Sequence, residues 1–132
     1  STLYFRAFSD SSGYELWKSD GTSISLVKDI NPGAAPGFPQ SVGEFAQRTA
    51  RLLTAVGSEL YFFANDGVHG RELWKTDGTT AGTVMLKDIR PGGLGSTPRE
   101  GVNVNGLFFF TDSGGDEQGE NTAQGNCAAF FA

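Results

Sequence analysis

Residues 15–22 read ELWKSDGT, and residues 72–79 read ELWKTDGT. Seven of the eight positions are identical, and the eighth exchanges Ser19 for Thr76. The offset of 57 residues that separates Glu15 from Glu72 also relates residues 3–5, LYF, to residues 60–62, LYF. Self-similarity at a fixed spacing is typical of proteins built from repeated supersecondary units. The chain is therefore predicted to be a repeat protein.

A second shared stretch follows each copy of the motif. Residues 26–33, LVKDINPG, match residues 85–92, MLKDIRPG, at an offset of 59 residues. A third unit is expected to begin at Leu107, which lies 47 residues after Leu60. The natural period is then near 47 residues, and about ten residues within 38–51 are inserted between the first two units.

The second unit predicts short strands separated by turns. Strands are expected at Arg51–Val56, Glu59–Ala64, Arg71–Thr76 and Thr83–Ile89. The sequences Gly-Ser, Asn-Asp-Gly and Asp-Gly between these strands favour tight turns, and Pro91 ends the last strand. Four antiparallel strands in about 40 residues match one blade of a β-propeller. The predicted fold class is all-β, a partial β-propeller with one complete blade and two partial ones.

The repeat divides the chain into five parts. Residues 1–37 form a first unit that lacks its leading strand, and 38–50 are an insert with rough helical spacing. Residues 51–95 are the complete second unit, and 96–112 are a partial third one. Residues 113–132 show no repeat signal and are expected to be an irregular tail.

Composition excludes several classes of function. The net charge is −5 without any basic run, which disfavours nucleic acid and anionic membrane surfaces as partners. No apolar run approaches the roughly 20 residues of a membrane span, so no membrane insertion is expected. The single cysteine, Cys127, rules out an internal disulfide.

The quoted stretches resemble the family of repeat proteins named for the ELWxxDGT motif. The resemblance covers residues 2–111, with the insert as a departure, and the tail departs entirely. It implies a large, tandemly repeated bacterial protein that is secreted or attached to the cell surface and forms propeller-like β-structure. It implies no particular biochemical activity, because none is generally established for the family.

The candidate site residues are those of the repeated motif, and each has a structural and a functional reading. The two tryptophans either fill the space between neighbouring blades or stack on a ligand, and repetition favours the structural reading. The two Asp-Gly-Thr turns either bond their own backbone or contribute to a calcium site, and one carboxylate per turn favours the former. The motif residues are Glu15, Leu16, Trp17, Asp20, Gly21 and Thr22, with counterparts Glu72, Leu73, Trp74, Asp77, Gly78 and Thr79.

No constellation in the chain predicts catalysis, a metal site or a cofactor. His69 is the only histidine and is expected to be a surface turn residue, and no GxSxG motif is present. We therefore expect a non-catalytic binding or scaffold module with an unknown protein or glycan ligand, which self-associates through its incomplete blades. The alternative is a fragment of a propeller-type hydrolase that acts on glycans through carboxylates such as Glu59 and Glu100.

Overall fold

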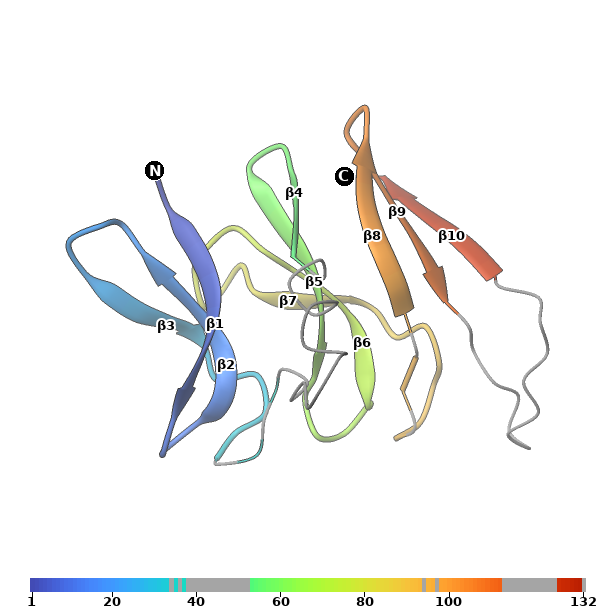
Figure 1. Cartoon of the computed structure of the whole chain (residues 1–132). Coiled ribbons are helices and arrows are strands. Elements are labelled where there is room, and N and C mark those ends of the chain that lie inside the picture. Colours follow the sequence, from blue (N-terminus) through green and yellow to red (C-terminus); the bar gives the residue numbers. More distant parts are fainter. Residues whose placement is uncertain are drawn as a thin grey trace.

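Three antiparallel β-sheets make up the part of the chain that the computed structural model describes (Figure 1). That part comprises residues 1–33, 35, 37, 53–93, 95, 96, 98–112 and 126–131. These residues form ten strands and no helix, which confirms the all-β class. The helical segment expected in the insert 38–50 lies outside the described residues.

The first sheet is a three-stranded meander. It consists of β1 (Leu3–Ser9), β2 (Gly13–Ser19) and β3 (Ile24–Lys28), in that order. The motif ELWK lies on the central strand β2, and the Asp-Gly-Thr turn joins β2 to β3.

The second sheet contains all four strands expected of the complete unit. They are β4 (Thr54–Val56), β5 (Glu59–Asn65), β6 (Arg71–Thr76) and β7 (Val84–Lys87), again in chain order. Gly57 has a φ of 61° in the tight turn between β4 and β5, where a left-handed backbone is required. The register shifts between Leu73 and Trp74 as it does between Leu16 and Trp17 in the first sheet, so the repeat extends to a shared β-bulge.

The third sheet consists of β8 (Pro98–Val104), β9 (Leu107–Asp112) and β10 (Asn126–Phe131). Asn105 and Gly106 have φ values of 53° and 83°, as a type I′ turn between β8 and β9 requires. Strand β10 lies in the tail that was expected to be irregular, and it pairs with β9 as β6 pairs with β5. The ladder bonds are made by backbone groups, so a segment unrelated to the motif can take this place.

The hairpin of the third sheet corrects the alignment of the third unit by one residue. Val104 pairs with Leu107 across the turn, as Val56 pairs with Glu59 in the second sheet. Leu107 is therefore the counterpart of Glu59 rather than of Leu60, and the spacing from Leu60 to its counterpart Phe108 is 48 residues. The correction matters because a shift of one residue along a strand exchanges the two faces of the sheet.

Each sheet has two faces, which we name after the motif residues that they carry. The Trp face is the side of Trp17 or Trp74, and the Leu face is the side of Leu16 or Leu73. In the third sheet, Phe108 marks the Trp face because it is the counterpart of Leu60, which lies on the same side as Trp74.

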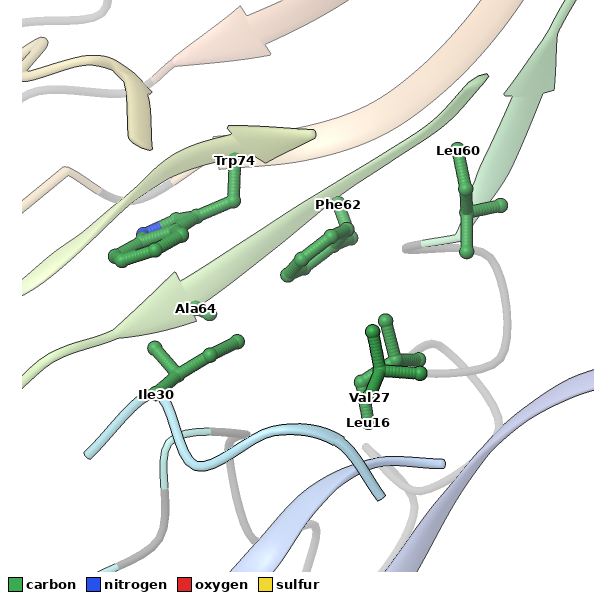
Figure 2. Close-up of a cluster of buried hydrophobic side chains, with 7 residues drawn as sticks. All are labelled: Leu16, Val27, Ile30, Leu60, Phe62, Ala64 and Trp74. Carbon is green, nitrogen blue, oxygen red and sulfur yellow. The ribbon is translucent and has the colours of Figure 1, made fainter. Parts of the chain in front are cut away.

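Two hydrophobic cores hold the three sheets together. The first core joins the Leu face of the first sheet to the Trp face of the second (Figure 2), and its buried residues are Leu16, Val27, Ile30, Leu60, Phe62, Ala64 and Trp74. The second core joins the Leu face of the second sheet to the Trp face of the third, and its buried residues are Val56, Tyr61, Phe63, Leu73, Phe108 and Phe110. Strand β5 is buried on both sides because its successive residues alternate between the two cores.

Candidate functional site

The motif glutamates Glu15 and Glu72 are fully buried and bond the backbone that follows the last strand of their own sheet. Glu15 Oε1 accepts hydrogen bonds from the backbone N–H groups of Asn31, at 3.2 Å, and Gly37, at 3.0 Å. Glu72 accepts them from Ile89, at 2.6 Å to Oε2, and Ser96, at 3.0 Å to Oε1. Each glutamate therefore fixes the connection that leaves its sheet.

Burial sets the charge state of these two carboxyl groups. It raises the pKa of Glu15 to about 7, against the opposing effect of the backbone N–H donors, and the nearby Asp29 raises it further. Burial also raises the pKa of Glu72 above its ordinary range. Raised carboxyl pKa values occur at catalytic acids. In this protein both side chains are closed off from solvent, so a substrate in solution has no direct access to them.

Gly37 is a partner of Glu15 that the sequence analysis did not identify. A Cβ at this position would collide with both carboxylate oxygens of Glu15, so a larger residue here would force the carboxylate away from its backbone donors. The carbonyl of Gly37 accepts a hydrogen bond of 2.8 Å from the backbone N–H of Asn65 in β5. The Glu15 carboxylate thus positions a residue that ties the first sheet to the second.

The two Asp-Gly-Thr turns use their carboxylates locally. Asp20 Oδ1 accepts bonds of 2.8 and 2.7 Å from the N–H and hydroxyl of Thr22, and one of 2.8 Å from the N–H of Ser23. Asp77 Oδ1 accepts bonds of 2.8 and 2.7 Å from the same two groups of Thr79. The side-chain hydroxyl and backbone donors hold the pKa of Asp20 and that of Asp77 below the ordinary aspartate range. This is the turn-forming role expected from the sequence.

The motif tryptophans occupy the same register but differ in burial. Trp17 pairs with Phe5 and Leu26, and Trp74 pairs with Phe62 and Met85. Trp74 is buried in the first core, whereas Trp17 is only partly buried. The structural reading, in which the tryptophans fill the space between neighbouring sheets, therefore holds for Trp74, whereas no described sheet covers the face that carries Trp17.

Two lysines of the first unit bond the second unit, which the sequence analysis also missed. Lys18 Nζ donates to the carbonyl of Gly78 at 2.6 Å, and Lys28 Nζ donates to that of Thr83 at 2.8 Å. Lys28 Nζ also lies 5.9 Å from the centre of the Trp74 ring. The signal available in the sequence was that both lysines have a counterpart in the second unit, Lys75 for Lys18 and Lys87 for Lys28.

His69 is a turn residue, as expected. Its side chain is 42% exposed, and its Nδ1 lies 2.7 Å from Asp66 Oδ2. The hydrogen bond to Asp66 raises the pKa of His69. Among the described residues, no group of three or more His, Cys, Asp or Glu side chains is placed to hold a metal ion.

Comparison of the chain with protein-family models, with curated proteins and with solved structures found no match. In the described part of the chain, no helix is long and apolar enough to cross a membrane. The proposed function therefore rests on the geometry of the motif residues.

Proposed function

We propose that this chain is a non-catalytic β-propeller module of a secreted or surface-attached protein, in which the repeated motif builds the scaffold and the connecting loops bind a protein or glycan ligand. The proposal rests on the hydrogen bonds that the motif carboxylates accept. Glu15, Glu72, Asp20 and Asp77 each bond backbone N–H groups of their own unit.

The stacking of the sheets supports the propeller architecture. Each described contact between sheets joins the Leu face of one unit to the Trp face of the next. The same kind of packing contact therefore occurs twice in succession. β-Propellers are built in this way, from successive sheets that pack on one another through the same contact. The resemblance of the motif to the ELWxxDGT family, with its implied surface location, points in the same direction.

The raised pKa values of Glu15, to about 7, and of Glu72 favour the alternative of a glycan hydrolase. A general acid must protonate the leaving oxygen while a second carboxylate lies on the other side of the scissile bond, roughly 5–10 Å away. Glu15 is instead buried against Asn31 and Gly37. We therefore assign its pKa to burial within the scaffold.

The test combines binding and turnover on one panel of glycans and extracellular proteins. We expect binding to at least one probe, with no release of reducing sugar, and equal binding by the Glu15→Gln variant once its folding has been verified. Hydrolysis that disappears in Glu15→Gln while the fold is retained would overturn the proposal in favour of the hydrolase. Failure to bind any probe would contradict the ligand-binding part of the proposal.

A further inference from the structure

The contact between a Leu face and a Trp face is made twice within this chain. In the first core, Leu16 and Val27 of the first sheet meet Phe62 of the second. In the second core, Leu73 of the second sheet meets Phe108 of the third. The repeated units thus carry complementary faces that pack in one fixed order.

Within the described part of the chain, the same two kinds of face remain uncovered at the two outer sheets (Figure 1). Leu3 on the Trp face of the first sheet is 65% exposed, whereas its counterpart Leu60 is 9% exposed. Val104 on the Leu face of the third sheet is 46% exposed, whereas its counterpart Val56 is 2% exposed. Exposed large apolar patches of this kind mark interaction surfaces.

Both uncovered faces are apolar over several neighbouring strands. On the first sheet, Leu3, Phe5, Trp17, Ile24 and Leu26 share the Trp face, because residues paired across strands lie on the same side. On the third sheet, the Leu face carries Val102, Val104, Leu107 and Phe109 by the same reasoning. The named residues are all uncharged. Glu15 also lies on the Trp face, two residues from Trp17, but it is fully buried and bonded to backbone N–H groups of its own unit, so docking would not newly bury its charge.

We propose that a second copy of this chain covers both faces. The Leu face of the third sheet in each copy docks on the Trp face of the first sheet in the other. Docking two different faces generates either a closed ring or an open fibre, depending on the rotation between units. The described part of each chain forms three sheets, so two copies joined in this way bring six sheets together, within the range of about four to eight blades that closed propellers use.

The assembly depends only on the two faces, so it is independent of whether the module binds a ligand. The primary measurement is the mass of the chain in solution by light scattering coupled to gel filtration, over a series of micromolar concentrations. We expect twice the chain mass of 14.0 kDa. A monomer throughout, or a mass that grows without limit as concentration rises, would overturn the closed dimer.

Two variants place a charge on the proposed faces, and a third serves as a control. Leu3→Lys and Val104→Lys alter residues that are exposed in the single chain, so we expect the fold to persist, as circular dichroism can verify. Each should raise the dissociation constant at least about a hundredfold, because it buries an unpaired ammonium group in the interface. Val68→Lys should leave the dimer intact, since Val68 is 70% exposed on the turn between β5 and β6.

Mixing the two interface variants tests the order of the faces. In a mixture of Leu3→Lys and Val104→Lys, the unaltered Leu face of the first variant can dock on the unaltered Trp face of the second. One intact interface should then restore a one-to-one pair that neither variant forms alone. A mixture that stays monomeric, or a dimer that is insensitive to both substitutions, would show that the copies associate in another way.

Discussion

Replacing Trp74 with alanine removes the largest side chain of the first core. Trp74 lies buried beside Phe62, and Ile30, which follows β3, lies across the core from it (Figure 2). Lys28 Nζ lies 5.9 Å from the ring centre. The substitution therefore removes packing between the sheets and one cation–π contact at the same time.

We expect Trp74→Ala to lower the free energy of unfolding by about 3–5 kcal/mol, the range for truncating a buried tryptophan. The cation–π contact accounts for about 0.5–1 kcal/mol of that loss. At roughly 1–2 kcal/mol per molar urea for a chain of this size, the urea midpoint should fall by about 1.5–5 M. Because a domain is stable by only about 5–15 kcal/mol, Trp74→Phe provides a milder variant if Trp74→Ala does not fold.

Trp17→Ala is the matched control, since Trp17 has the same register in a sheet whose Trp face no described sheet covers. It should cost about 1–2 kcal/mol, because only part of its surface is buried within the chain. Both variants are followed by urea denaturation with circular dichroism, at concentrations low enough to keep the chains apart. Equal losses for Trp17→Ala and Trp74→Ala under those conditions would refute the assignment of Trp74 to an interface between sheets.

Three further predictions concern the motif carboxylates. The pKa of Glu15 is raised in the fold to about 7, so its stabilising contribution is complete below about pH 4.5 and is lost as pH rises through 7. The free energy of unfolding should rise by about 2 kcal/mol between pH 8 and pH 5, and an equal rise in Glu15→Gln would contradict this. Gly37→Ala should cost about 1–3 kcal/mol through its collision with Glu15, and a double-mutant cycle with Glu15→Ala should show coupling rather than additivity. Millimolar calcium should leave the thermal midpoint unchanged relative to a chelator, and stoichiometric submicromolar calcium binding in calorimetry would refute the absence of a calcium site. Asp77→Ala should lower the thermal midpoint, because the N–H and hydroxyl of Thr79 lose their acceptor.

The sequence predicted most of the strands because the signals for strands and turns are local. The four strands of the second unit follow from short stretches rich in apolar and aromatic residues that are separated by Gly-Ser, Asn-Asp-Gly and Asp-Gly turns. The role of Asp20 and Asp77 in their turns also follows locally, because their partners lie two or three residues away. These interactions need no knowledge of the tertiary fold.

Interactions between units were harder to predict. Gly37 lies 22 residues from Glu15, and Lys18 lies 60 residues from Gly78, so only the folded chain brings these pairs together. The third unit was misaligned by one residue because LFFF, at residues 107–110, fits the pattern LYFF at residues 60–63 in sequence. The pairing of Val104 with Leu107 decides the register instead.

By itself, the sequence determined that the chain forms short antiparallel strands, because a motif of eight residues occurs twice with turn residues at matching places. Only the tertiary structure decided which face of each sheet meets its neighbour. That choice depends on strand register, where a shift of one residue exchanges the faces. The order in which the faces meet also explains why the tryptophans of the two motif copies differ in burial. Trp74 is covered by the preceding sheet, whereas no described sheet covers the face that carries Trp17.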